Sequence, residues 1–294
     1  MYADHRNGIV IKAAAKINWG LAILGTRTDG YHLLRSVMQR VDLQDTLSIR
    51  QAQKDSCQMA LAVSDEDNLA LRCWRLLKQK YNLPGGLAIN IEKVIPAGGG
   101  LAGGSADGAA VMLAVNELFH LGLTNQELRQ NAVTIGADLP FCLLGQAALA
   151  EGIGEKLTPL RPRYAQKLLL ANPGIGINTA AVFALFDQLS APPIPDMDAL
   201  ATGLTTGDAQ AVRAQMRNML EPAAFTIAPM LIPLKNLLEH DGLQVVMSGS
   251  GATMIGWSAD NELVEFVAAK RQSQINWLRV VNTIGDKYER RQNK

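Results

Sequence analysis

The sequence feature that most constrains this chain is a run of glycines at positions 98–104, inside the stretch PAGGGLAGGSADGAA. Five of these seven residues are glycine, although each glycine costs backbone entropy on folding. The run follows a predicted strand and precedes a predicted helix from about Ser105 to Gly122. A glycine-rich loop that opens a helix presents unpaired N–H groups at the positive end of the helix dipole, so the pattern predicts a phosphate-binding loop. A glycine-rich turn without a ligand is the alternative.

Two common nucleotide-binding motifs fit this run poorly. A Walker A loop, GxxxxGK[ST], would need a lysine at Gly104. A dinucleotide fingerprint, GxGxxG, is matched by three of the glycines, but it needs a strand running directly into them and another strand after the helix. Pro96 interrupts the first strand, and residues 121–131 predict a second helix in place of the other. A nicotinamide oxidoreductase is therefore the weaker alternative.

Composition indicates what kind of ligand to expect. Hydrophobic residues make up 48% of the chain and charged ones 19%, which is typical of a globular enzyme and excludes a disordered protein. The net charge of +1 creates no field that would attract nucleic acid or an anionic membrane. We therefore expect a small-molecule substrate, with neither nucleic acid nor a membrane as partner. Composition does not decide between a monomer and a homodimer.

Targeting and metal-binding signals are scarce in the sequence. No stretch of 18 apolar residues occurs, and the N-terminus lacks the apolar core of a secretory signal, which favours a cytoplasmic protein. The three cysteines lie far apart with no CxxC pair, and only four histidines are present. We therefore expect neither a disulfide framework nor a metal site built from protein ligands.

Predicted strands and helices mix without the regular alternation of a parallel sheet, which indicates an α+β protein. The length of 294 residues is sufficient for two domains. Residues 158–164 (TPLRPRY) are rich in turn formers and precede a predicted strand, so we expect domains at 1–160 and 161–294. Other predicted elements are strands at 9–15 and 41–50 and helices at 69–81, 208–220 and 229–240.

Several blocks together resemble the GHMP family of small-molecule kinases. The glycine run resembles that family's PxxxGLGGGSS loop, and the other blocks are AKINWGLAILGTRTDGYHLLRSVMQ, IGADLPFCLLGQAALAEGIGEKLTPL, NPGIGINTAAVF, NMLEPAAF and MSGSGATMIG. The resemblance extends from about Lys12 to Trp257. It implies a two-domain α+β fold, with an N-terminal domain like domain 2 of ribosomal protein S5 and a ferredoxin-like C-terminal domain.

The resemblance also implies ATP and Mg²⁺ as cofactors. The blocks are most similar to family members that phosphorylate a hydroxyl of a diphosphocytidyl methylerythritol in the non-mevalonate isoprenoid pathway. Two loop positions depart from the family pattern, because Ala102 replaces a glycine and Ala106 a second serine. By resemblance, the ATP-binding residues are Pro96, Ala97, Gly98, Gly99, Gly100, Leu101, Ala102, Gly103, Gly104, Ser105 and Ala106.

Lys16 and Asp138 are the catalytic candidates. Without the resemblance, we would interpret Lys16 as a solvated lysine at a strand end and Asp138 as a turn or helix-capping aspartate. The resemblance implies that they face each other beside the phosphate loop. There the carboxylate would accept the proton of the substrate hydroxyl, and the ammonium would keep it ionised and neutralise charge on the transferred group.

The substrate-binding candidates are mainly aromatic. Tyr31 and His32 lie beside a glycine turn, where an aromatic ring can stack on a base or pack as ordinary core. By resemblance they bind the cytosine of the substrate, with Phe183 on its other face. Asn18 and Thr179 are candidate polar contacts.

Other interpretations remain open at this point. Residues 248–253 (SGSGAT) are either a plain hairpin or, by resemblance, part of the substrate side of the cleft. Another GHMP kinase with a different alcohol substrate and a nucleotide-binding regulator without turnover are the other functional alternatives. Tyr31 and His32 together favour the cytidine substrate over the first, and Lys16 with Asp138 argues against the second.

Overall fold

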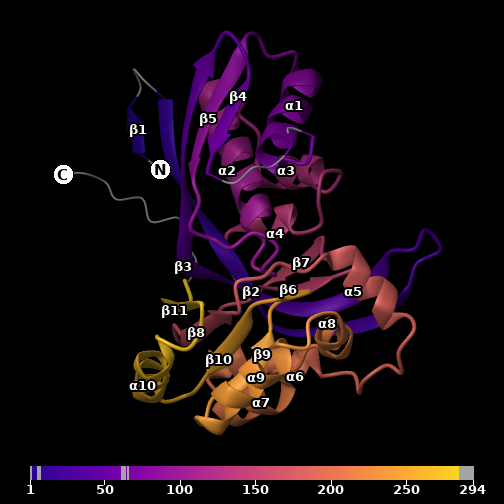
Figure 1. Cartoon of the computed structure of the whole chain (residues 1–294). Helices are drawn as coiled ribbons and strands as arrows, with labels where there is room; N and C mark the ends of the chain where they lie inside the picture. The colour runs from indigo at the N-terminus through magenta and orange to yellow at the C-terminus, as the bar shows by residue number, and fades with distance from the viewer. Residues whose placement is uncertain (1, 5–7, 61–63, 65, 285–294) are drawn as a thin grey trace.

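The computed structural model describes residues 2–4, 8–60, 64 and 66–284. The chain forms two lobes, each built on its own β-sheet with helices packed against it (Figure 1). The first sheet takes its strands from residues 2–159 and the second from residues 167–282. This arrangement agrees with the expected α+β class.

The first sheet has seven strands in the order β1-β2-β3-β5-β4, with β6 pairing to β3 and to β7. All of the pairs described are antiparallel except β4 with β5. Its strands are β1 (Tyr2–Asp4), β2 (Gly8–Thr26), β3 (His32–Ala52), β4 (Ser56–Met59), β5 (Gly86–Glu92), β6 (Ala148–Glu151) and β7 (Lys156–Pro159).

Four helices cover one face of this sheet: α1 (Leu69–Tyr81), α2 (Gly103–Leu118), α3 (Asn125–Ala132) and α4 (Leu139–Leu144). The Asn68 side chain caps α1 by accepting from the N–H groups of Ala70 and Leu71. Thr124 and Glu127 form a capping box at the start of α3. The predicted helix at 69–81 is confirmed.

The second sheet is antiparallel in the order β11-β8-β10-β9. Since it begins after residue 160, we keep 160/161 as the proposed domain boundary. Its strands are β8 (Lys167–Asn172), β9 (Gln244–Met247), β10 (Met254–Trp257) and β11 (Trp277–Asn282). The helices of this half are α5 (Thr179–Phe186), α6 (Met197–Thr206), α7 (Ala209–Gln215), α8 (Glu221–Ile227), α9 (Leu231–His240) and α10 (Asn261–Arg271).

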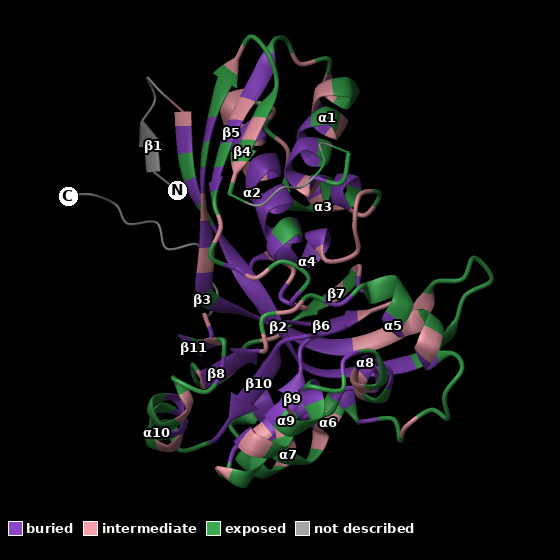
Figure 2. Cartoon of the chain, in the orientation of Figure 1, coloured by how far each residue is buried: buried purple, intermediate pink, exposed green. Residues whose placement is uncertain are grey.

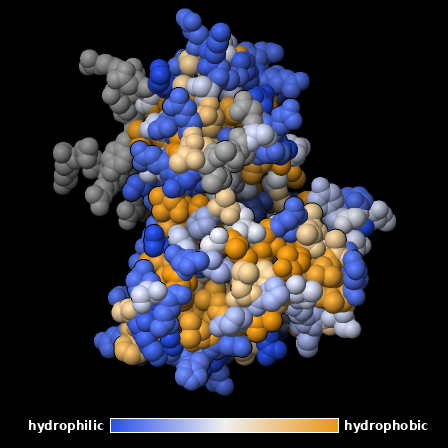
Figure 3. Space-filling view, viewed as in Figure 1, coloured by the Kyte–Doolittle hydropathy of each residue, from blue (hydrophilic) through white to orange (hydrophobic). Residues whose placement is uncertain are grey.

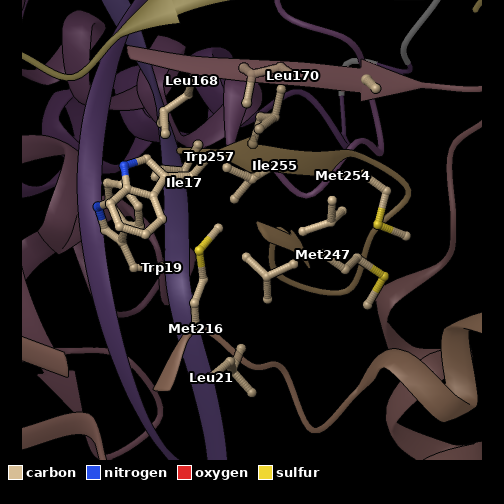
Figure 4. Close-up of a cluster of buried hydrophobic side chains, with 14 of the residues drawn as sticks. Ile17, Trp19, Leu21, Leu168, Leu170, Met216, Met247, Met254, Ile255 and Trp257 are labelled. Carbon is tan, nitrogen blue, oxygen red and sulfur yellow. The ribbon is translucent and has the colours of Figure 1, made fainter. Parts of the chain in front are cut away.

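Strand β2 belongs to both lobes. Its first half packs under α1 and α2, whereas Ile17, Trp19 and Leu21 join the core of the second lobe (Figure 4). The Trp19 indole meets Trp257 of β10 edge to face, with ring centroids 6.0 Å apart. The middle of β2 is accordingly buried (Figure 2). The two lobes therefore share one continuous strand rather than meeting only at a linker.

The structure corrects several predicted elements. Strands β2 and β3 are far longer than the predicted 9–15 and 41–50. The prediction relied on alternation of buried and exposed residues, and the middle parts of both strands are buried on both faces and show none. The predicted helix at 208–220 ends at Gln215 as α7. Helices α6 and α10 had not been predicted.

Hydrophobic surface gathers over the middle and lower part of the molecule on the face shown in Figure 3, while the top is mainly hydrophilic. Among the described residues, no helix combines the length and the apolarity needed to cross a membrane.

Candidate active site

The predicted site residues converge on one cleft of about 950 Å³. This volume lies at the upper end of the range for ligand pockets. Leu101 and Ala106, which had been predicted to bind ATP, are buried and do not line the cleft. The predicted residues that do line it are Lys16, Asn18, Tyr31, His32, Pro96, Ala97, Gly98, Gly99, Gly100, Ala102, Gly103, Gly104, Ser105, Asp138, Thr179 and Phe183.

Two irregularities in β2 position Lys16 and Asn18. The β2–β3 register shifts between Ala14 and Lys16 and again between Asn18 and Gly20. Such bulges re-aim side chains, and they are common next to active sites. Lys16 and Asn18 share the face of β2 that lines the cleft, and the residues between and beside them pack into the core.

Lys16 is buried, with 3% of its surface exposed, yet its ammonium is well partnered. Its Nζ donates to Asn18 Oδ1 at 2.7 Å and to the Gly100 carbonyl at 3.1 Å, and it lies 3.7 Å from Asp138 Oδ2. Asp138 immediately precedes α4, but its carboxylate makes no capping hydrogen bond, so it is available to a ligand. The pair predicted from the sequence is therefore assembled at the loop.

The loop glycines allow two segments from different lobes to touch. A Cβ built on Gly100 would lie 2.0 Å from the Ser248 carbonyl oxygen, and one on Gly98 would lie 3.1 Å from Gly176 Cα. Both have a positive φ, of 75° and 64°. Positions 98 and 100 therefore need glycine because the loop packs against the second lobe, and not only because a ligand must come close to the backbone.

Helix α2 begins without a side-chain cap. No described residue accepts a hydrogen bond from the N–H groups of Gly103, Gly104 or Ser105, and all three residues line the cleft. Unpaired amides at the positive end of a helix dipole are the arrangement that an anion site requires, so phosphate binding at this loop stays a prediction. A side chain at Gly103 would press on Ile95 beneath the loop.

Ala102 stands in the left-handed region with a φ of 55°, directly before α2. Since an alanine there is strained by about 1 to 2 kcal/mol, we expect Ala102→Gly to raise the free energy of unfolding by roughly 0.5 to 1 kcal/mol after the entropy cost of glycine. Urea denaturation measures this. Ala109→Gly, inside the same helix, should have the opposite sign, and a loss of stability in Ala102→Gly would contradict the prediction.

The glycine segment 248–251 between β9 and β10 closes the loop region from the second lobe. Ser248 Oγ donates to the Gly100 carbonyl at 2.9 Å, and Thr179 Oγ1 lies 2.7 Å from Ser250 Oγ. Asn218, for which the sequence suggested no role, holds this segment by donating to the carbonyls of Met247 and Gly249, both at 2.7 Å. The segment is thus a hairpin connection and also a wall of the cleft.

The aromatic candidates also line the cleft. The His32 ring stacks on Phe183, with centroids 4.7 Å apart and an interplanar angle of 29°. His32 Nε2 lies 2.7 Å from Asp187 Oδ1. Tyr31 is 59% exposed. All three side chains line the cleft, and their contact with a cytosine stays a prediction. The sequence did not indicate the Asp187 contact.

A buried charged cluster beside the start of α2 was missed from the sequence. Lys93 Nζ bonds both Asp45 and Asp107. Burial raises the pKa of the Asp107 carboxyl to about 7 although the Lys93 ammonium acts against it. Asp107 Oδ1 has no hydrogen-bond partner on the described residues. Lys93 and Asp107 both line the cleft, which makes them candidates for contact with a nucleotide.

The described residues contain no group of three or more histidine, cysteine or acidic side chains placed to hold a metal ion. Mg²⁺ in phosphoryl-transfer sites is often held by phosphate oxygens and only one or two protein oxygens. The Ser105 hydroxyl and the free Oδ1 of Asp107 fit such a partial set.

Comparison with known proteins places this site in a family. The GHMP kinases N terminal domain matches residues 68–146, and the GHMP kinases C terminal domain matches residues 197–276. The 4-diphosphocytidyl-2-C-methyl-D-erythritol kinase of Clostridium botulinum is 38% identical over 254 residues, which cover 85% of this chain and 91% of that protein. The chain belongs to the 4-diphosphocytidyl-2-C-methyl-D-erythritol kinase family. The kinase of the same name from Lachnospira eligens is 36% identical over 86% of this chain and 90% of its own length.

Solved structures of this and other kinase families share the fold. A crystal structure of 4-(cytidine 5'-diphospho)-2C-methyl-D-erythritol kinase matches with a TM-score of 0.79 and 31% identity, covering 95% of this chain and all of that one. Homoserine kinase from Cytophaga hutchinsonii matches with a TM-score of 0.71 at 17% identity, with 97% of both chains covered, which shows the fold alone. The expected family and α+β kinase fold are confirmed.

Proposed function

We propose that the chain transfers the terminal phosphoryl group of ATP to a hydroxyl of 4-diphosphocytidyl-2-C-methyl-D-erythritol. The observation that carries the chemistry is the Lys16–Asp138 pair, 3.7 Å apart at the glycine loop. Its relatives at 36% and 38% identity, named as kinases of this substrate, support the choice of acceptor.

The residues divide the reaction between binding and proton transfer. The unpartnered amides at the start of α2 hold phosphate oxygens, and the loop fixes their position. Asp138 accepts the proton of the attacking hydroxyl. Lys16 keeps that carboxylate ionised and stabilises negative charge on the transferred group, while Asn18 and the Gly100 carbonyl fix the direction of the ammonium.

Mg²⁺, when bound with ATP, would neutralise part of the phosphate charge. Ser105 and Asp107 are the residues of this chain that would hold it, because both supply oxygens at the N-terminal turn of α2. Lys93 fixes the Asp107 carboxylate through its other oxygen.

The test is a coupled ADP-release assay with ATP, Mg²⁺ and a panel of alcohols that includes the diphosphocytidyl substrate, homoserine and mevalonate. We expect turnover with the diphosphocytidyl compound alone. Turnover with another alcohol would point to a different kinase of the same fold, and ATP binding without any turnover would point to a regulator.

The aromatic residues of the cleft give a second test. Stacking one base on an aromatic ring is worth about 1 to 3 kcal/mol, so Tyr31→Ala or Phe183→Ala should raise KM for the diphosphocytidyl substrate by roughly 5- to 150-fold. The KM for ATP should change little. Tyr164→Ala is the matched control, because Tyr164 is 54% exposed and does not line the cleft. An equal rise in the KM for ATP would assign these rings to the nucleotide site.

A further inference from the structure

The C-terminal end of α5 and the residue that follows it carry two groups that contact one ring. Phe183 supports the face of the His32 imidazole, and Asp187, four residues further on, meets its Nε2 edge at 2.7 Å. The Asp187 backbone N–H donates to the Phe183 carbonyl, which ties the two residues together. The His32 ring is therefore held by Phe183 on one face and by Asp187 at one edge, and its side chain is only 10% exposed.

Hydrogen-bond chemistry then fixes the hydrogen on Nε2 and, in the neutral ring, the state of Nδ1 as well. An ionised carboxylate only accepts hydrogen bonds, so Nε2 must carry the hydrogen that is shared with Asp187. In the neutral ring, Nδ1 is left with a lone pair. No described residue bonds Nδ1, and His32 lines the cleft, so this nitrogen is the polar group of the ring left for a ligand.

We infer that Asp187 is a positioning residue that makes His32 Nδ1 a hydrogen-bond acceptor and thereby selects cytosine over uracil. A base stacked on Phe183 lies in the layer of the His32 ring and meets it edge to edge. Cytosine presents an amino group at the position where uracil presents a carbonyl oxygen. The amino group donates to Nδ1, whereas the carbonyl would place two lone pairs against each other. This inference rests on the proposed function.

Asp187→Asn tests the inference, because it keeps the size of the side chain but lets its amide donate as well as accept. Either nitrogen of His32 can then carry the hydrogen. We expect the ratio of kcat/KM for the cytidine substrate to kcat/KM for its uridine analogue to fall roughly tenfold. The KM for ATP should stay the same.

Glu265→Gln is the matched control, since it also removes an exposed carboxylate from an ion pair, with Lys167, away from the cleft. In a His32→Ala background, Asp187→Asn should have no further effect on the ratio. An unchanged ratio in Asp187→Asn would overturn the inference while leaving the proposed function intact. Failure of the wild-type protein to phosphorylate the cytidine compound would overturn both.

Nitrogen-15 NMR of the imidazole rings gives a second measurement that needs neither substrate nor the variant at Asp187. The chain has four histidines, and loss of one signal in His32→Ala assigns the ring. At a pH of about 9, where histidine side chains in general are neutral, we expect hydrogen on Nε2 and a bare Nδ1. Hydrogen on Nδ1 would overturn the inference.

Discussion

Asp138→Asn is expected to lower kcat by roughly 10²- to 10⁴-fold while ATP still binds. The substitution removes the proton acceptor but keeps the shape of the side chain. Since the Asp138 carboxylate caps no helix, its loss should leave the start of α4 intact. The buried Lys16 ammonium keeps its bonds to Asn18 and Gly100. Steady-state kinetics together with calorimetric ATP titration separates the loss of chemistry from a loss of binding.

Asp208→Asn provides the control for removal of a carboxylate at a helix start. Asp208 caps α7 by accepting from Gln210 and Ala211, and asparagine caps equally well. Its turnover should match that of the wild-type protein. If Asp138→Asn retained turnover within threefold of wild type, Asp138 would not be the proton acceptor.

Gly100→Ala should have the largest effect on stability. The residue has a φ of 75°, and its Cβ would lie 2.0 Å from the Ser248 carbonyl, so both the backbone strain and the contact must be relieved by moving the two lobes apart. We expect a loss of about 3 kcal/mol or more in the free energy of unfolding. ATP affinity should fall with it, because the carbonyl that holds Lys16 is displaced.

Gly104→Ala, four residues along the same run, is the matched comparison. Its Cβ would meet only Leu69 Cδ1, at an ordinary 3.5 Å, and its φ is not positive. Urea unfolding of the two variants should therefore differ by several kcal/mol. Equal stabilities would show that the contact between the loop and Ser248 does not constrain residue 100.

Local features of the fold were predictable from the sequence. Asn68 ends a loop and caps α1, and Thr124 with Glu127 caps α3, because each of these signals acts within three residues. The lengths of β2 and β3 were not predictable from alternation, since their partners on both faces come from distant segments. The helix predicted to reach residue 220 stops at Gln215, and Asn218 beyond it donates to the distant carbonyls of Met247 and Gly249, contacts that no local signal indicates.

The candidate site was predicted to a different extent in each part. The resemblance identified Lys16 and Asp138, and the glycine run alone indicated the anion site. No sequence motif marked Asp187 or Asp107 as a site residue. The contacts that make them candidates, with His32 and Lys93, form only when the chain folds. His32 and Asp187 are 155 residues apart in the chain. Leu101 and Ala106 were included because loop motifs are read as continuous runs, whereas a folded loop turns some residues inward.

Strand β2 carries two sets of side chains that cannot exchange places. At the first two of its three bulges, Lys16 and Asn18 face the cleft, while Ile17 and Trp19 pack in the core. Inserting or deleting one residue here would turn every side chain to the other face. The ammonium would then enter an apolar core, and the indole would enter the phosphate site. The number of residues between these two bulges is therefore constrained as strictly as the identity of the lysine itself.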